Sequence, residues 1–360
     1  MMSWDVFGLF MLVLWVGKKA REKIPADPAS MCCVAALRAG SSFPCGKFFI
    51  RQPNTYPTRF DWQPLNCAIT EKNFEQIRVT AFDHPLLPSA QAPLVNPAEL
   101  PGWVRFEDET LLVIDKPGWL VVHPSKSGPW SSLAGALREG LGLQTIRFVY
   151  RLDRETSGVI ILAKAEATGA RLQKAMSKRL VGKAYVALLE GELTESVTVD
   201  RALGPDPTAN VTVKQRVVES GSAGAQEAVT VFCPLVARNG YTLAGIELHT
   251  GRKHQIRAHA EWLGRRVVGD KLYGPDPSLY LEFATRGWTA RHSALLATTR
   301  QALHCAAIDL RRAGVDAVFT AQWPADLAQF TGRAMRLPAS EAQAAIDDFV
   351  ARIFGRETTA

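Results

Sequence analysis

Residues 150–158 read Tyr-Arg-Leu-Asp-Arg-Glu-Thr-Ser-Gly, so that Asp153 stands between Arg151 and Arg154. In an extended segment, Arg151 and Asp153 project to one side and Leu152 to the other, which leaves Leu152 to anchor the backbone in the core. Nearby arginines favour the charged form of a carboxylate. We therefore expect an ionised Asp153 that acts as a nucleophile or general base toward an anionic polymer attracted by the same arginines.

Four further blocks accompany this stretch. They read Val-Ile-Asp-Lys-Pro-Gly-Trp-Leu-Val-Val-His-Pro at 113–124, Lys-Ala-Tyr-Val-Ala-Leu-Leu-Glu-Gly at 183–191, Leu-His-Thr-Gly-Arg-Lys-His-Gln-Ile-Arg-Ala-His at 248–259 and Gly-Asp-Lys-Leu-Tyr-Gly at 269–274. Taken together and in this order, the blocks resemble the RluA-type family of RNA pseudouridine synthases over about residues 104–312. Several separated blocks in the right order are far more specific than Arg-Leu-Asp alone.

The resemblance implies an α+β fold, in which a mixed, mainly antiparallel bent sheet with flanking helices carries a central basic cleft. The residues point the same way, because strands separated by turns and only occasional helices indicate α+β rather than alternating βαβ units. Leu111–Ile114 and Leu120–Val122 are expected to form a hairpin around a turn at 115–118. Further strands are expected at Phe148–Leu152, Val159–Leu162, Tyr185–Leu189, Val211–Val218, Ala228–Phe232 and Tyr241–Leu248, and helices at Ser131–Leu141, Ala165–Ser177 and Ser340–Phe354.

The reaction that the resemblance implies converts uridine to its C-glycoside. It breaks the bond from ribose C1′ to N1, turns the freed uracil within the pocket, and rejoins it through C5. Such an isomerisation needs a carboxylate near the sugar, room for the base to turn and exclusion of water, but no metal and no organic cofactor. The sequence agrees with this demand, because it contains neither metal-ligand spacing nor a glycine-rich loop that would cradle phosphate.

The resemblance also implies roles for four residues. Asp153 matches the family's essential aspartate, Arg257 the arginine that pairs with it, and Tyr185 the tyrosine that lies against the uracil. Arg151 matches a residue that enters the RNA stack and helps hold the target nucleotide out of it, since a stacked, paired base hides its glycosidic bond. Whether Asp153 adds covalently to the sugar or abstracts a proton after cleavage stays open. A loop staple between Asp153 and Arg151 or Arg154 is the structural alternative.

Three more cations are candidates for RNA binding. Lys183 lies two residues before Tyr185 on the same strand face, where it could neutralise a phosphate. Thr250–Leu263 is expected to form a helix capped by Thr250, which would put Arg252 and Lys253 in the first turn, beside backbone N–H groups that favour phosphate. A solvated surface charge is the alternative for each. The two histidines of this segment, His254 and His259, have the wrong spacing for a helical metal pair and are interpreted as packing or hydrogen-bonding residues.

The regions outside these blocks are less informative. Residues 24–100 are rich in proline, serine and asparagine without a sustained period, so we expect an irregular arm. The chain is therefore divided into an N-terminal arm at 1–100, a catalytic domain at 101–330 and a C-terminal helical tail at 331–360. The arm lacks the pattern of the S4-type RNA-binding module that many family members carry.

An apolar run covers Val6–Gly17 and is followed by a cluster of lysine and arginine at 18–23. It is too short to span a bilayer comfortably, and a signal peptide would carry its positive charge before the run. We expect no membrane function. The run is either an interfacial or core helix, or non-native sequence added by an upstream start, with Met31 as the alternative start.

The chain has 360 residues, 47% of them apolar, and a formal net charge of +7. It can bury one large core or two modest ones, and its charge permits a polyanionic partner. Six cysteines without Cys-x-x-Cys spacing or a set of histidine partners favour reduced thiols in the cytoplasm over a zinc site or a disulfide framework. We expect a cytoplasmic monomer whose partner is RNA, either rRNA or tRNA, with no metal and no cofactor.

Two rival functions are open. A non-catalytic RNA-binding or ribosome-assembly protein could keep this fold, although it would have no need of a carboxylate in a basic cleft. A glycoside hydrolase would also break a bond at an anomeric carbon, but it works with paired carboxylates, and no second acidic residue stands in a recognisable partner motif.

Overall fold

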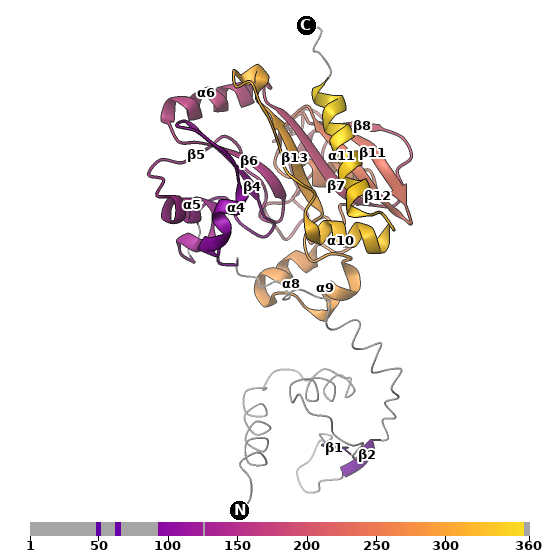
Figure 1. Ribbon diagram of the computed structural model, residues 1–360. Coiled ribbons are helices and arrows are strands. Elements are labelled where there is room, and N and C mark those ends of the chain that lie inside the picture. Colours follow the sequence, from indigo (N-terminus) through magenta and orange to yellow (C-terminus); the bar gives the residue numbers. More distant parts are fainter. Residues whose placement is uncertain (1–47, 52–61, 66–92, 125–126, 356–360) are drawn as a thin grey trace, which may run out of the picture. The chain divides into compact units, whose positions relative to one another are not determined.

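The computed structural model describes residues 93–124 and 127–355, together with the backbone of two short strands, β1 (Phe48–Arg51) and β2 (Trp62–Leu65), which pair antiparallel. The chain divides into one unit at 1–84 and a second at 85–360. The apolar run at 6–17 and most of the expected N-terminal arm lie outside the described residues. All that follows concerns the second unit (Figure 1).

A ten-stranded sheet forms the centre of this unit. Its main path runs β3-β4-β6-β13-β7-β12-β11-β8, with β5 added to β6 and β14 added to β13. Of the strand pairs described, β6 and β13 run parallel and the others antiparallel. The predicted α+β class with a mixed, mainly antiparallel sheet is therefore confirmed. The strands are β3 (Val104–Glu107), β4 (Leu111–Lys116), β5 (Arg147–Phe148), β6 (Ser157–Ala163), β7 (Gly182–Glu190), β8 (Val197–Asp200), β11 (Val229–Arg238), β12 (Tyr241–Leu248), β13 (Leu303–Asp309) and β14 (Val318–Thr320), and a separate pair joins β9 (Leu203–Pro205) to β10 (Gln215–Val217).

Helices cover both faces of the sheet. They are α4 (Leu100–Trp103), α5 (Leu133–Leu141), α6 (Glu166–Ser177), α7 (Gln255–Trp262), α8 (Ser278–Arg286), α9 (Ala290–Leu295), α10 (Ala325–Ala334) and α11 (Ala339–Phe354), with 3-10 turns at Pro97–Glu99, Pro129–Ser131 and Arg311–Ala313. Within the described part of the chain, none of these helices combines the length and the apolar character that crossing a membrane requires.

Strand β7 shows which helices lie on which face. Its side chains alternate, as expected of a strand buried on both sides. Tyr185 and Leu189 pack in one apolar cluster with Ile256 of α7. Val186 and Leu188 pack in another cluster with residues of α10 and α11. Tyr185 therefore faces α7, on the side of the sheet away from α10 and α11.

Several predicted elements are confirmed, with ends that differ by a few residues at most. They are Val159–Leu162 in β6, Tyr185–Leu189 in β7, Tyr241–Leu248 as β12, Ala165–Ser177 in α6 and Ser340–Phe354 in α11. In each of these elements, the apolar residues recur with the period of a strand or helix, and they pack against the core.

The predicted hairpin at 111–122 is wrong. Leu111–Lys116 forms β4, but it pairs with β3 and β6, and Val121 makes only an isolated bridge to Ser132. The chain folds back after β4 because the Lys116 ammonium donates to the carbonyls of Pro117 and Leu120, both at 2.9 Å. The strands predicted at 148–152 and 211–218 are much shorter than expected, and only β5 and β10 form in these regions.

Gly158 stands where the sheet leaves no room for a side chain. It pairs with Cys305 at the parallel contact of β6 and β13 and has φ +107°. A Cβ built there would lie 2.2 Å from the Cys305 carbonyl oxygen. The glycine is therefore required by both backbone conformation and space.

We expect Gly158→Ala to destabilise the protein more than Gly128→Ala. Gly128 also has a positive φ, +98°, but a Cβ there meets nothing within 4 Å among the described residues. Both substitutions carry backbone strain of about 1–3 kcal/mol, and Gly158→Ala adds an overpacking cost of about 1–3 kcal/mol. Urea unfolding of both variants measures the difference, and equal losses would contradict the close contact with Cys305.

Candidate functional site

Asp153 and Arg257 meet although they are 104 residues apart in the sequence. Asp153 lies on the loop between β5 and β6, anchored by the buried Leu152 as predicted, and Arg257 lies in the first turn of α7. The guanidinium Nη1 donates to Asp153 Oδ2 at 2.8 Å. The Asp153 side chain keeps 35% of its surface exposed, so the carboxylate is held on one side and open on the other.

A second carboxylate fixes Arg257 from behind. Its Nε and Nη2 donate to the two oxygens of Asp270 at 2.5 and 2.8 Å, and its guanidinium lies over the Tyr273 ring, 4.9 Å from the centroid. Asp270 is fully buried and also accepts from the backbone N–H groups of Leu272 and Tyr273. This bidentate pair leaves Nη1 aimed at Asp153. The sequence analysis quoted the block that contains Asp270 but gave Asp270 no role in the site.

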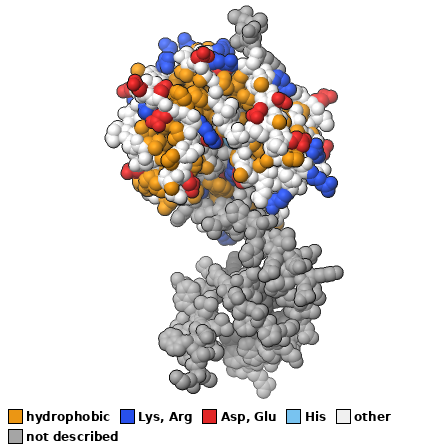
Figure 2. Space-filling model, in the orientation of Figure 1, with side chains coloured by type: hydrophobic (Ala, Val, Ile, Leu, Met, Phe, Trp, Pro, Cys, Tyr) orange, Lys and Arg blue, Asp and Glu red, His pale blue; other side chains and the backbone are white. Residues whose placement is uncertain are grey.

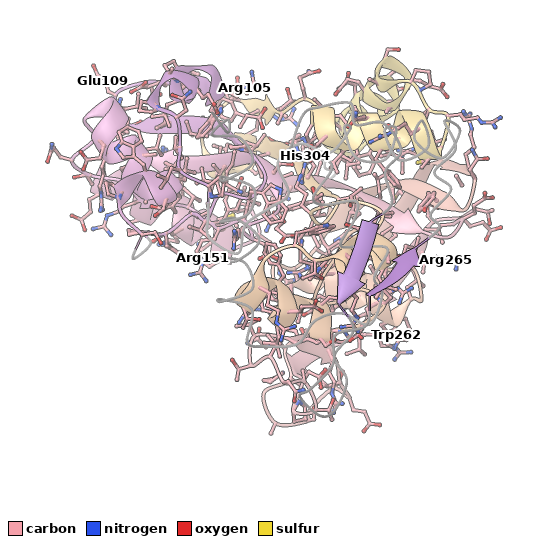
Figure 3. All side chains as sticks on the ribbon, turned by 90° about the horizontal axis from the view of Figure 1, so that it is seen from below. Arg105, Glu109, Arg151, Trp262, Arg265 and His304 are labelled. Atoms are coloured by element: carbon pink, nitrogen blue, oxygen red, sulfur yellow. The ribbon has the colours of Figure 1, made fainter. Side chains whose placement is uncertain are left out.

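The Asp153 carboxylate is ionised at neutral pH. Burial acts to raise its pKa, but the charges of Arg257 and His254 and the hydrogen bond from Arg257 outweigh burial, so that the net pKa lies below the ordinary value of 3.8. The structural alternative, a loop staple, does not describe the Arg151 side chain, because Asp153 pairs with Arg257 instead. Arg151 is exposed and directed away from the ribbon, with Nη1 3.0 Å from His123 Nε2 (Figure 3).

His254 is a neighbour of Asp153 that the sequence interpretation did not assign to the site. Its Nε2 lies 3.9 Å from Asp153 Oδ2, and its Nδ1 lies 3.0 Å from the Tyr273 hydroxyl. Burial, helped by the charge of Arg257, lowers the pKa of His254 to about 4, so the imidazole is neutral at pH 7. The prediction that His254 and His259 act by packing and hydrogen bonding is confirmed, since His259 bonds Thr230 Oγ1.

The helix predicted to begin at Thr250 begins at Gln255 instead. The preceding residue, His254, has a left-handed φ of 54° and makes no side-chain cap. Thr250 accepts from the N–H of Val229 rather than capping the helix, and the Gln255 side chain accepts from the N–H of Arg252. These side-chain bonds hold 250–254 as a loop, because each replaces a bond that the first helical turn would make.

Tyr185 lies on β7, is almost completely buried, and is near enough to Asp153 for that carboxylate to act on its pKa. Burial, followed by the nearby Cys305 and Asp153, raises the pKa of Tyr185 well above its ordinary value, so the phenol is neutral. Tyr150 is half-buried, and its hydroxyl donates to the Val159 carbonyl of β6, which makes it part of the scaffold.

The structure divides the remaining candidates into two groups. Lys183 shares the Tyr185 face of β7 and is half-buried, and burial lowers its pKa. Arg252 and Lys253 are exposed in the loop before α7, not in its first turn, and Arg252 Nε donates to the Glu227 carbonyl at 2.9 Å. Arg257 thus meets Asp153, and Lys183 shares a strand face with Tyr185, whereas Arg151, Arg252 and Lys253 lie at the surface. Across residues 93–124 and 127–355, no group of His, Cys, Asp and Glu side chains is arranged to hold a metal ion.

Comparison with known proteins identifies the same region of the chain. A family model described as RNA pseudouridylate synthase matches residues 110–262. An uncharacterized RNA pseudouridine synthase of Chlorobaculum parvum is 32% identical over 277 residues, which cover 74% of this chain and 82% of that protein. Ribosomal large subunit pseudouridine synthase D of Nitrosomonas europaea is 32% identical over 251 residues, 67% of each chain.

Two further matches cover different shares of their proteins. An uncharacterized RNA pseudouridine synthase of Helicobacter pylori is 37% identical over 193 residues, but the match covers 51% of this chain and 58% of that one, less than two thirds of its length. The solved structure of human RNA pseudouridylate synthase domain containing 4 superposes with a TM-score of 0.51 at 22% identity, covering 66% of this chain and 95% of that one. This last likeness concerns the fold.

We expect Asp270→Asn to destabilise the protein by about 3 kcal/mol, because it removes one partner of a buried ion pair. The pH dependence carries a second signature. Burial acts to raise the pKa of Asp270, but Arg257 and the backbone N–H donors outweigh it and lower the pKa. The wild-type charge pair therefore stabilises the protein above pH 3.8, and this contribution is lost as pH falls through the lower folded pKa.

Urea unfolding between pH 3 and 7 measures both effects. Asp270→Asn should flatten the acid limb of the stability curve relative to wild type. Asp348→Asn is the matched control, since Asp348 is an exposed residue of α11 and its loss should leave the curve close to that of the wild type. Equal curves for the two variants would contradict the buried pair.

Proposed function

The chain belongs to the RluA-type family of RNA pseudouridine synthases, and from this premise we propose that it isomerises specific uridines of RNA to pseudouridine. The observation that carries the proposal is the ionised and partly exposed Asp153 carboxylate, which is held by Arg257. The relatives that show the family are both named as pseudouridine synthases. An RNA-binding scaffold would have no use for a carboxylate whose ionisation is maintained by a buried guanidinium.

Asp153 supplies the negative charge that the ribose needs. The bond from C1′ to N1 breaks, the uracil turns, and C1′ bonds to C5, after which C5 loses a proton and N1 gains one. Asp153 either adds to the sugar and leaves again, or removes a proton after cleavage. Both routes start from the ionised carboxylate and leave Arg257 paired with Asp270 throughout.

Tyr185 and Arg151 serve the uridine itself. The neutral phenol of Tyr185 offers an aromatic face to the uracil and a hydroxyl for a hydrogen bond. Arg151 is exposed next to Asp153, where its guanidinium can enter the stack that the target base has left. Lys183, Arg252 and Lys253 contribute charge toward the phosphates.

We further propose that the substrate is rRNA or tRNA in the cytoplasm, bound by a monomer without metal or organic cofactor. The name of the Nitrosomonas europaea relative, a ribosomal large subunit synthase, supports rRNA as the first substrate to test. The net charge of +7 suits either RNA.

The test is pseudouridine mapping after incubation of the purified protein with rRNA and tRNA that lack the modification. Wild-type protein should convert specific uridines, and Asp153→Asn should lose activity by at least about 10³-fold, because the variant carries no ionisable carboxylate. Asp309→Asn, which alters a surface pair with Arg311, should keep full activity.

Two outcomes would favour the rivals. A fully active Asp153→Asn, or wild-type protein inactive on every RNA, would contradict the proposed reaction. Rescue of a growth defect by Asp153→Ala would point to a non-catalytic RNA-binding protein, and release of free sugar from a panel of glycosides would point to a glycoside hydrolase.

Arg151→Ala tests the role of Arg151 separately. We expect KM to rise about tenfold, because one charge-assisted contact with the RNA is lost. The slope of RNA affinity against salt concentration, on logarithmic axes, should become shallower by about one unit. Arg138→Ala, an exposed arginine of α5, is the control and should change neither quantity. Unchanged KM and slope for Arg151→Ala would contradict its contact with RNA.

A further inference from the structure

Two buried cations reach the backbone directly after Asp153. The Lys116 ammonium, fully buried at the end of β4, donates to the carbonyl of Arg154 at 3.3 Å as well as to Pro117 and Leu120. The Arg300 guanidinium, 2% exposed, donates from Nη1 to the carbonyl of Glu155 at 3.0 Å. Both peptide groups of the Asp153 turn are therefore held by charge-assisted hydrogen bonds.

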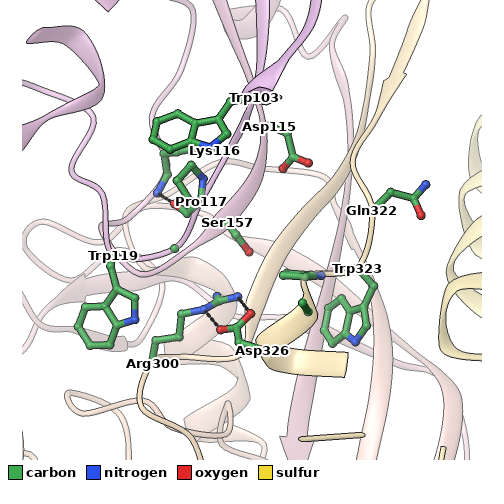
Figure 4. Close-up of a pocket in the computed structure, with 13 residues that line it drawn as sticks. Trp103, Asp115, Lys116, Pro117, Trp119, Ser157, Arg300, Gln322, Trp323 and Asp326 are labelled. Carbon is green, nitrogen blue, oxygen red and sulfur yellow. Dashed lines mark hydrogen bonds and ion pairs between the residues drawn. The ribbon is translucent and has the colours of Figure 1, made fainter. Parts of the chain in front are cut away.

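Arg300 is itself oriented by Asp326, in the first turn of α10. Nε and Nη2 donate to the two oxygens of Asp326 at 2.6 and 3.0 Å (Figure 4). The remaining nitrogen, Nη1, bonds the carbonyls of Glu155 and Gln301. Because every nitrogen of the guanidinium is committed, Arg300 cannot tilt without moving the Glu155 carbonyl.

These residues line a cavity of about 470 Å³ that belongs to the face of the sheet carrying α10. Its walls include Trp103, Trp119 and Trp323 besides Lys116 and Arg300 (Figure 4). Trp323 packs in the cluster that contains Val186, whereas Tyr185 faces the other side of the sheet. Figure 2 shows this face hollowed near its centre. The Asp153 turn is thus held from the face opposite to Tyr185.

Burying these cations is costly, which argues for a purpose beyond filling space. Burial, with the charge of Arg300, lowers the pKa of Lys116 to about 7, while Asp153 and Glu155 act in the opposite direction. Gly118 leaves room for the contact, because a Cβ there would lie 2.7 Å from the Arg300 side chain. An apolar filling of the same volume would carry no desolvation cost, but it could not hold the two carbonyls.

We propose that Lys116 and Arg300 are positioning residues of the Asp153 turn, and that Asp326 sets the position of Arg300 from the opposite face of the sheet. The inference rests on the proposed function, since the turn matters through the carboxylate that it carries. A displacement of a reacting group by about 1 Å can cost about 100-fold in rate. The ion pair of Arg300 with Asp326 therefore acts on the rate of the chemical step rather than on RNA binding.

Two acidic residues of the same cavity make a matched test. Asp326→Asn should lower kcat by about 10- to 100-fold with KM changed less than about twofold. Asp115→Asn should leave kcat unchanged, because Asp115 pairs with Arg105 at 2.6 Å and that pair does not reach the turn. Asp326→Glu, which keeps the charge, should recover most of the rate. Equal kcat for Asp326→Asn and Asp115→Asn would overturn the proposal.

Hydrogen exchange of residues 150–158 provides a readout that does not depend on activity. The Thr156 N–H donates to the Asp153 carbonyl at 3.1 Å, so a loosened turn exchanges faster. We expect faster exchange in Asp326→Asn and wild-type exchange in Asp115→Asn, and unchanged exchange in both would contradict the proposal even if the wild-type protein made no pseudouridine. If thermal unfolding shows that Asp326→Asn has lost the fold, Arg300→Lys, which keeps a buried cation without the forked donors, takes its place with the same expected results.

Discussion

The site depends on one guanidinium shared by two carboxylates. Arg257 is nearly buried, and a buried charge is tolerated only when its donors are satisfied. Asp270 binds Nε and Nη2, which leaves Nη1 as the nitrogen that donates to Asp153. In the proposed reaction, Asp153 gives up its charge to the sugar or to a proton. Arg257 then keeps its partner Asp270, so the buried guanidinium remains paired with a carboxylate when Asp153 loses its charge.

The turn that carries Asp153 is held residue by residue from distant parts of the chain. Lys271 donates to both oxygens of the Glu155 carboxylate at 2.9 and 3.1 Å, and Gln301 donates to the Thr156 hydroxyl at 2.7 Å. Lys116, Arg257 and Lys271 come from three of the blocks quoted from the sequence, and each makes a contact to this turn. The strands and helices between the blocks bring these contacts together, and Arg300 and Gln301 add contacts from a later segment.

Regular elements could be predicted from the sequence because their apolar patterns match a face of the core. Strand β7 and helices α6 and α11 are of this kind. The predictions failed where single hydrogen bonds decide the backbone. Lys116 folds the segment after β4 back on itself, and Gln255 holds 250–254 as a loop, and neither effect leaves a periodic trace in the sequence.

The site shows the same division. The pairing of Asp153 with Arg257 was expected from the resemblance to a family, and the structure joins them. Asp270, His254 and Arg300 were missed because each acts through a partner that is remote in sequence or on another element. The one feature of the sequence that pointed to Asp270 was an acidic residue directly after Gly269. Without the fold, such a residue cannot be distinguished from an ordinary turn residue.

The protonation states around Arg257 separate the proposed isomerase from a glycoside hydrolase. Glycoside hydrolysis needs a second carboxyl group that is protonated and reaches the oxygen of the leaving group. Asp270 is the second carboxyl group beside Arg257, but it is fully buried, it accepts four hydrogen bonds, and its pKa is lowered rather than raised. It therefore has neither a proton to give nor a path to a substrate. With His254 and Tyr185 both neutral at pH 7, Asp153 is the group of this cluster that is both charged and open, which suits a rearrangement that begins and ends without net proton transfer to solvent.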